Sequence, residues 1–211
     1  MRGKRGLTAT AAGAVLVAAV WALWPPPASR VANLDSTGST IVAFGDSLTA
    51  GYGAGAGDDY PSRLASALGE TIVNAGVSGD TTAAALERID DDVLARDPRI
   101  VIVGLGGNDY LRGVPIATTE ANLRAIVRRI QDAGAMVVLL GYRFPSLQVD
   151  YGAMYERIAD EERALLVPDL LDGILSQPAL RSDAIHPNAA GYAILAARVE
   201  EPLRELLREA R

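Results

Sequence analysis

The chain has 211 residues, 49% of them hydrophobic, and a formal net charge of −6. Such an acidic chain repels phosphate backbones, so we expect no nucleic-acid partner. Having no Cys and a single His, it has neither a thiol nucleophile nor a disulfide framework, and a zinc ion would have almost only carboxylates as ligands. We therefore expect no metal and no other cofactor.

The first part of the chain has the pattern of an export or anchoring segment. Three basic residues precede an uncharged run at residues 7–24, and three prolines follow it. This order is typical of a signal peptide, but the run is also about long enough to remain as a membrane anchor. Both alternatives place the protein outside the cytoplasm, periplasmic or secreted, or anchored by residues 7–24. We expect residues 1–38 to comprise this segment and a polar linker, and residues 39–211 to form one monomeric domain.

The stretch from Phe44 to Gly53 is the one around which the remaining motifs are arranged. The apolar, partly β-branched run Ile41–Phe44 is followed at once by Gly45, which predicts a buried strand ending in a tight turn with Ser47 at its tip. A serine there is often only a turn residue. Residues 51–57 contain four glycines, so we expect a mobile loop beside the serine.

Strands and helices are predicted to alternate along the rest of the chain. Apolar runs predict strands at 71–74, 99–103, 135–140 and 164–167. Helical periodicity predicts helices beginning near residues 59, 80, 118 and 188, the first capped by Asp58 or Asp59, the second by Asp80, and the last kinked at Pro202. The alternation indicates an α/β fold of three α/β/α layers, with a flavodoxin-like parallel sheet of about five strands.

Polar residues follow several of these strands. Ser47, Gly79 and Asn108 each come after a different predicted strand, and a loop containing Asp183 and His186 precedes the last helix. In open parallel sheets, ligands bind beyond the carboxyl ends of the strands. We therefore expect the four loops to converge on one rim.

These residue types suit nucleophilic catalysis. A serine hydroxyl needs a base that titrates near neutrality, and only His186 offers one. Asp183 lies three residues earlier, close enough to orient the imidazole. The N–H groups of Ser47 and Gly79 and the amide of Asn108 are candidate donors to an oxyanion.

Four short motifs resemble, in order, the functional blocks of the SGNH/GDSL hydrolase family. They are Gly45-Asp46-Ser47-Leu48, the stretch Asn74 to Thr81 containing Gly79, Gly106-Gly107-Asn108-Asp109, and Asp183-Ala184-Ile185-His186-Pro187. The likeness runs from about residue 40 to about residue 207. It is strongest to the branch of bacterial thioesterase I/lysophospholipase and arylesterase enzymes, although that branch more often has a small residue where Tyr110 stands.

The resemblance implies the same roles as the residues themselves. Ser47 would be the nucleophile, His186 the base and Asp183 its orienting partner. Ser47, Gly79 and Asn108 would form the oxyanion hole. The Gly-x-Ser-x-Gly elbow of other α/β-hydrolases does not occur in the sequence.

The predicted function is an extracytoplasmic serine esterase that hydrolyses ester or thioester bonds through an acyl-enzyme. A carbohydrate acetylesterase is the nearest enzymatic alternative, and a non-catalytic acyl-binding module comes from another class. A phosphate-dependent signalling domain that uses Asp46 would leave His186 unexplained.

Apolar residues in two loops are expected to bind the acyl chain. Their alternative role is core packing. The groove they would form predicts a preference for short-to-medium acyl chains over acetyl, with long chains limited by Tyr110 and gated by the glycine loop. The expected substrate-binding residues are Tyr110, Leu111, Phe144 and Tyr151, with Val114, Pro145 and Leu147 nearby.

Overall fold

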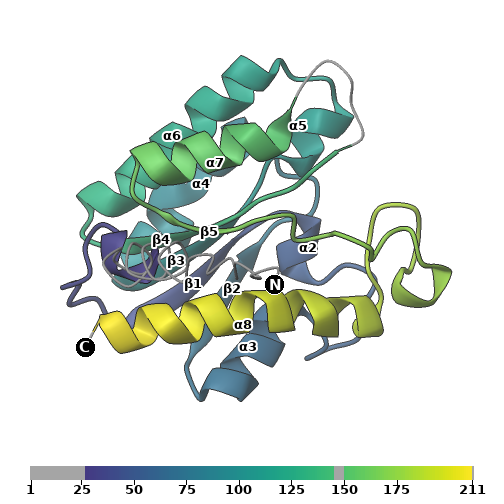
Figure 1. The fold of residues 1–211 in the computed structure, drawn as a ribbon, viewed down its shortest axis with the longest axis horizontal. Helices are drawn as coiled ribbons and strands as arrows, with labels where there is room; N and C mark the ends of the chain where they lie inside the picture. The colour runs from purple at the N-terminus through teal and green to yellow at the C-terminus, as the bar shows by residue number, and fades with distance from the viewer. Residues whose placement is uncertain (1–26, 145–149, 211) are drawn as a thin grey trace, which may run out of the picture.

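The computed structural model describes residues 27–144 and 150–210, so the apolar run at 7–24 and the loop residues Pro145 and Leu147 lie outside it. A five-stranded parallel sheet stands between two layers of helices, which confirms the expected fold class (Figure 1). The strands are β1 Thr40–Gly45, β2 Ile72–Gly76, β3 Pro98–Gly104, β4 Met136–Leu140 and β5 Leu165–Val167. The helices are α2 Ser47–Ala50, α3 Tyr60–Leu68, α4 Thr82–Asp92, α5 Gly107–Leu111, α6 Ile116–Asp132, α7 Tyr151–Glu161 and α8 Ala189–Glu209, with short 3-10 turns η1 Pro27–Arg30, η2 Leu94–Arg96 and η3 Pro178–Leu180.

The strand order β2-β1-β3-β4-β5 creates a crevice at one edge of the sheet. From β1 the chain first adds β2 on one side and then crosses to β3 on the other. Gly45 at the end of β1 pairs with both Gly76 and Gly104, so these three strands end at the same level. Such a reversal of strand order is where open α/β sheets bind ligands.

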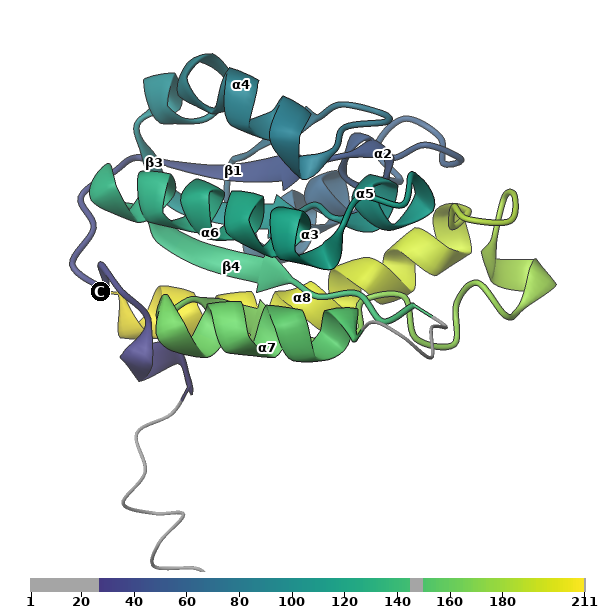
Figure 2. The same cartoon turned by 90° about the horizontal axis from the view of Figure 1, so that it is seen from above.

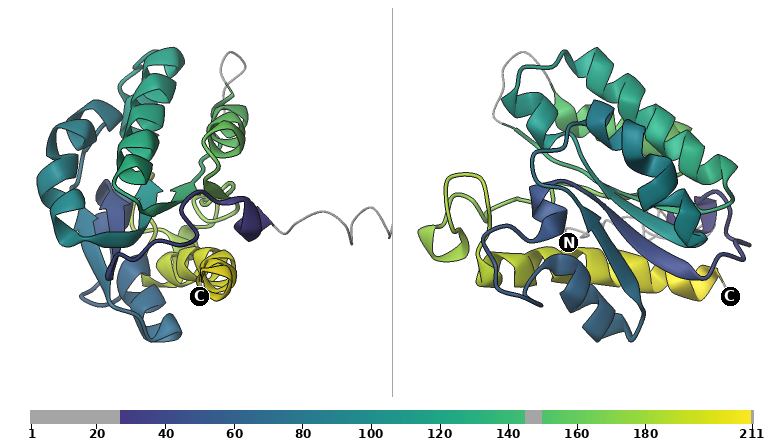
Figure 3. Two further views of the ribbon diagram at one scale, coloured as in Figure 1. Left: turned by 90° about the vertical axis from the view of Figure 1, so that its left-hand side faces the viewer. Right: turned by 180° about the vertical axis from the view of Figure 1, so that it is seen from behind.

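Helices cover both faces of the sheet. Helices α4, α6 and α7 lie on one face, and α3 and α8 lie on the other (Figure 3). The apolar faces of α6 and α8 are buried, and α8 continues through Pro202 to Glu209. Within residues 27–144 and 150–210, none of the helices is long and apolar enough to cross a bilayer.

The expectation of a polar linker up to residue 38 does not hold for residues 28–33. Ala28 and Val31 are buried in the core, with 1% and 2% of their surface exposed. The backbone N–H of Ala32 donates to the carbonyl of Arg163 at 2.9 Å, and the Asn33 amide donates to the carbonyls of Gln131, at the end of α6, and Ala135, just before β4. This segment packs at the end of the domain opposite the carboxyl ends of the strands (Figure 2).

The N-cap of α4 also differs from the prediction. Thr81, not Asp80, caps this helix by accepting the N–H of Ala84 at 3.3 Å. The Asp80 carboxylate instead binds Arg88, about two turns into the helix. Helix α7 was not predicted at all, although its buried residues Tyr151, Met154, Tyr155 and Ile158 follow helical spacing.

Candidate active site

The four predicted loops meet at the carboxyl edge of the sheet. Ser47 opens α2 after β1, Gly79 lies between β2 and α4, and Asn108 lies in α5 after β3. The segment between β5 and α8 lies beside them at the same end of the molecule (Figure 2). Residues from all four loops line one cavity of about 510 Å³. The sequence therefore predicted correctly which loops come together.

Ser47 is held at the start of a single helical turn. Asp46 is the N-cap of α2, and its Oδ1 accepts the N–H of Leu48 at 3.0 Å. This turn directs the Ser47 side chain toward the last loop, where its Oγ lies 2.9 Å from Nε2 of His186. A hydroxyl and an imidazole at this distance have the geometry of a nucleophile and its base.

The histidine loop is stabilised by its own backbone and by one carboxylate. Oδ2 of Asp183 lies 2.7 Å from Nδ1 of His186, and Oδ1 accepts the N–H groups of Ile185 and His186, both at 2.8 Å. The hydrogen bond from His186 lowers the pKa of Asp183, so this carboxylate is ionised across the neutral range. An ionised carboxylate at Nδ1 fixes both the tautomer and the orientation of the ring.

The start of the glycine-rich segment packs against this loop. The Tyr52 ring lies 4.5 Å from the His186 ring, centroid to centroid, and Tyr192 donates to the Tyr52 carbonyl at 2.9 Å. Gly53 has a φ of +89°, and a Cβ there would clash with Ser182 and with the Pro187 carbonyl. Only glycine allows so close an approach. These residues therefore form part of the wall around His186.

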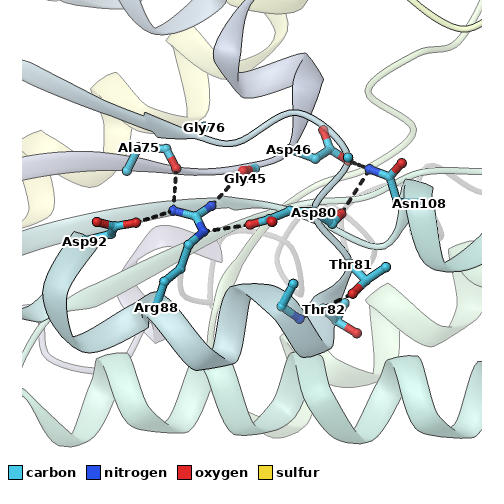
Figure 4. Close-up of polar contacts among 12 residues, drawn as sticks. Gly45, Asp46, Ala75, Gly76, Asp80, Thr81, Thr82, Arg88, Asp92 and Asn108 are labelled. Carbon is cyan, nitrogen blue, oxygen red and sulfur yellow. Dashed lines mark hydrogen bonds and ion pairs between the residues drawn. The ribbon is translucent and has the colours of Figure 1, made fainter.

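Three donors converge near Ser47. Gly79 has a φ of +86°, a conformation that favours glycine. In the part of the chain that the structure describes, neither the N–H of Ser47 nor that of Gly79 donates to a protein acceptor. The Asn108 amide donates to the Asp80 carbonyl at 2.9 Å and, at a longer 3.2 Å, to Oδ2 of Asp46 (Figure 4).

Further contacts tie the loops to one another. Both carboxylate oxygens of Asp109 accept hydrogen bonds from Thr82, one from its N–H at 2.9 Å and one from its hydroxyl at 2.6 Å. Arg112 donates to the Gly79 carbonyl at 2.8 Å. The loop after β2 is therefore attached to the segment after β3 through Asp109 and Arg112 as well as through Asn108.

Asp46 is a buried carboxylate between Ser47 and Asn108. Burial raises the pKa of Asp46 to about 6, and the nearby charge of Asp80 adds to this rise, while the N–H of Leu48, the charge of His186 and the Asn108 amide oppose it. Sequence reasoning gave Asp46 no role in hydrolysis, because a carboxylate before a turn serine is ordinarily a local cap.

The cavity has apolar walls from three segments of the chain, those after β3, β4 and β5. Tyr110, Leu111 and Phe144 line it as predicted, and the rings of Tyr110 and Phe144 stack with centroids 4.3 Å apart. Tyr151 does not line it: this residue is 3% exposed and packs edge-on behind the stacked pair. Tyr151 therefore does not contact the cavity as expected; it packs against Tyr110 and Phe144, which form the wall.

Sequence reasoning missed the third part of this wall. It comes from the segment between β5 and α8, for which the sequence predicts only the catalytic residues Asp183 and His186. Its apolar lining residues are Leu171, Leu175, Ala184 and Ile185. A faint signal existed in the apolar residues before the Asp183 loop, but nothing in their spacing says that they face a cavity.

No group of three or more His, Asp or Glu side chains within residues 27–144 and 150–210 is arranged to hold a metal ion.

Known proteins resemble this chain in both sequence and structure. The model of the GDSL-like Lipase/Acylhydrolase family matches residues 43–194. The chain is 32% identical over 182 residues to Esterase TesA of Pseudomonas aeruginosa, covering 80% of this chain and 89% of that protein. It is 32% identical over 176 residues to Thioesterase 1/protease 1/lysophospholipase L1 of Escherichia coli K12, covering 80% and 85%. A crystal structure of TesA superposes with a TM-score of 0.73 at 31% identity, covering 79% of this chain and 99% of that one.

Proposed function

Since this chain belongs to the GDSL-like lipase/acylhydrolase family of SGNH esterases, we propose that it cleaves carboxylic esters or thioesters through an acyl-enzyme formed on Ser47. One observation carries the proposal. The hydroxyl of Ser47, the ring of His186 and the carboxylate of Asp183 are joined in sequence by contacts of 2.9 and 2.7 Å, at a cavity with apolar walls. A binding module would need none of these contacts.

The geometry supports a two-step reaction. Nε2 of His186 takes the Ser47 proton as Oγ attacks the acyl carbonyl, and the resulting tetrahedral adduct expels the alcohol or thiol, which receives that proton from His186. Water then attacks the acyl-enzyme with His186 again acting as base, which releases the carboxylic acid and restores the Ser47 hydroxyl. Asp183 remains ionised throughout and stabilises the imidazolium.

The adduct oxygen takes its hydrogen bonds from three groups. The N–H groups of Ser47 and Gly79 are available for it. The Asn108 amide supplies the third by sharing the hydrogen now directed to Asp46, the longer of its two bonds at 3.2 Å. The shorter bond to the Asp80 carbonyl remains and keeps the amide in place.

The acyl group of the substrate is proposed to be an alkyl chain. The cavity is lined by aromatic and aliphatic side chains from three segments, and each methylene buried there contributes about 0.8 kcal/mol to binding. An acetyl group uses little of such a surface. This favours short-to-medium acyl esters over the carbohydrate acetylesterase alternative, in which the acyl group is only two carbons long.

The proposal also includes export and a monomeric state. The basic and apolar pattern of the first 24 residues supports an extracytoplasmic enzyme, either released or held in a membrane by residues 7–24. Fractionation of cells that express the full chain tests this. Activity in the periplasm, medium or membrane supports export, whereas activity confined to the cytosol contradicts it, and light scattering of the purified enzyme gives the oligomeric state.

The nucleophile is tested by covalent labelling. An organophosphonate should modify the wild-type chain once, with the label on Ser47 by mass spectrometry, and Ser47→Ala should neither react nor hydrolyse an aryl ester while keeping its thermal unfolding transition. Ser78 provides an internal control because it lines the same cavity. Label on Ser78, or hydrolysis by Ser47→Ala, would contradict the assignment.

A further inference from the structure

Arg88 connects three chain segments directly behind the proposed oxyanion donors. It lies on α4, in the helical pattern of an ordinary surface arginine, yet only 17% of its side chain is exposed. Figure 4 shows its guanidinium among Gly45, Ala75, Asp80 and Asp92. Its carbon also lies 4.4 Å from the centre of the Phe44 ring, which supports the group from β1.

The guanidinium makes four hydrogen bonds. Nε donates to Oδ2 of Asp80 at 2.7 Å, and Nη2 donates to the carbonyl of Gly45 at 3.0 Å. Nη1 donates to the carbonyl of Ala75 at 3.0 Å and to Oδ2 of Asp92 at 2.9 Å. Gly45 and Ala75 are at the carboxyl ends of β1 and β2, where each strand enters a loop of the site.

Two of these four contacts, Gly45 and Asp80, lie one or two residues away from a proposed donor. Gly45 is two residues before Ser47. Asp80 directly follows Gly79, and its carbonyl holds the Asn108 amide at 2.9 Å. A single planar group therefore fixes the segments of Ser47 and Gly79 relative to each other, and it reaches Asn108 through the Asp80 carbonyl.

We propose that Arg88 is a positioning residue for ester hydrolysis, which holds the segments of Ser47, Gly79 and Asn108 in the arrangement that receives the oxyanion. The inference rests on the proposed function. It differs from a purely stabilising ion pair, because the bonds to Gly45 and Asp80 define the distance between two loops. Lysine has the charge but not the planar fork, so it cannot make these bonds together.

The main test compares Arg88→Lys with Arg124→Lys. Arg124 is a matched control: 18% of its side chain is exposed and it pairs with Glu120, Glu161 and Glu162, on the outer part of α6. At pH 8 and below the unfolding transition of each variant, Arg88→Lys should lower kcat roughly 10- to 100-fold with little change in KM, because displacement of aligned groups costs rate. Arg124→Lys should leave both constants nearly unchanged.

A double mutant shows whether Arg88 acts through the oxyanion hole. In an Asn108→Ala background, Arg88→Lys should lower kcat far less than it does in the wild type, because one of the groups that it positions is already gone. Equal fold-losses in the two backgrounds would overturn the proposal. So would an Arg88→Lys enzyme whose kcat matches that of Arg124→Lys.

The two acidic partners of Arg88 give a milder comparison that preserves the fold. Asp80→Asn weakens the contact to the loop of Gly79, whereas Asp92→Asn weakens a contact on the far side of the same guanidinium. We expect several-fold loss of kcat in Asp80→Asn and little in Asp92→Asn; equal effects would count against the proposal. A wild-type enzyme without hydrolysis at Ser47 would overturn the proposed function together with this inference, whereas an active wild type with unaffected Arg88→Lys overturns the inference alone.

Discussion

Asp183 and His186 are joined twice within one loop: Oδ2 of the carboxylate lies 2.7 Å from Nδ1 of the ring, and Oδ1 accepts the backbone N–H of His186 at 2.8 Å. The same side chain therefore shapes the loop and orients the base. Three residues of sequence separation are enough for this, so the pair forms without help from distant elements.

Asp183→Asn separates these two tasks. The amide oxygen of asparagine still accepts the loop N–H groups, but its NH₂ faces Nδ1 and favours the wrong tautomer of His186. We expect kcat to fall by roughly 10²- to 10⁴-fold at pH 8 with the loop intact. Steady-state kinetics and a thermal unfolding curve measure both effects, and a loss confined to KM would show that Asp183 acts on substrate binding instead.

Asn108→Ala removes one oxyanion donor and its bonds to Asp46 and Asp80. Because the amide acts mainly on the developing negative charge, kcat should fall by roughly 10²- to 10³-fold with KM little changed. Asn122→Ala is a suitable control, since the Asn122 amide donates to the Thr82 hydroxyl at the start of α4 and Asn122 does not line the cavity. If only KM changes, Asn108 is a binding residue rather than a donor to the oxyanion.

The sequence predicted the sheet and the catalytic motifs because each depends on short-range patterns. Continuous apolar runs specify β3 and β4, and Asp183 reaches His186 within a single loop. Asp80 shows where this reasoning ends. An aspartate before a helix is ordinarily its N-cap, but here the guanidinium of Arg88 binds the carboxylate, and Thr81 caps the helix instead.

Other parts could not be predicted because they depend on contacts between distant segments. Ala28 and Val31 follow three prolines and looked like linker, yet they are buried against the core. Leu171 and Leu175 line the cavity only because the chain after β5 returns across the carboxyl edge of the sheet. Helix α7 is different, because the helical spacing of its apolar residues is present in the sequence itself.

The buried carboxylate of Asp46 predicts a dependence of stability on pH. Its pKa is about 6 in the folded protein against an ordinary 3.8, so the folded state binds the proton more tightly. The resulting stabilisation is fully present below about pH 4 and is lost as the pH rises through about 6. At pH 8, the ionised and buried group thus costs on the order of 3 kcal/mol relative to pH 4.

Asp46→Asn cannot ionise and should lack this dependence. In this variant the new amide at position 46 faces the Asn108 amide, and the effect of that contact on the free energy of unfolding is the same at every pH. The informative quantity is therefore how the difference in unfolding free energy between mutant and wild type changes with pH. Denaturant unfolding at half-unit steps from pH 4 to 8 should show the mutant gaining relative to the wild type as the pH rises. A difference that stays constant across this range would falsify the raised pKa of Asp46.

The chain-length preference follows from the apolar wall. Tyr110 is stacked on Phe144 with centroids 4.3 Å apart, and both line the cavity beside Ser47 and His186. Each acyl methylene that is buried in the cavity should add about 0.8 kcal/mol, or nearly fourfold in affinity. This gain should stop at the chain length at which the Tyr110 ring blocks further carbons. We therefore expect kcat/KM on aryl esters to rise from acetyl to medium chains and then to level or fall.

Tyr110→Gly should move the optimum to longer acyl chains, because it opens the wall without touching Ser47, His186 or Asp183. Leu175 lines the cavity from the segment between β5 and α8, so Leu175→Ala should move the optimum in the same direction. Leu207 packs against the core but does not line the cavity, so Leu207→Ala should lower stability without changing the chain-length profile. The measurement is kcat/KM on esters from roughly two to sixteen acyl carbons, each added carbon being one methylene increment, for all four enzymes. A wild-type profile that is highest at acetyl and that neither cavity substitution shifts would contradict the acyl cavity and favour a carbohydrate acetylesterase, since a two-carbon acyl group gains nothing from the Tyr110 wall.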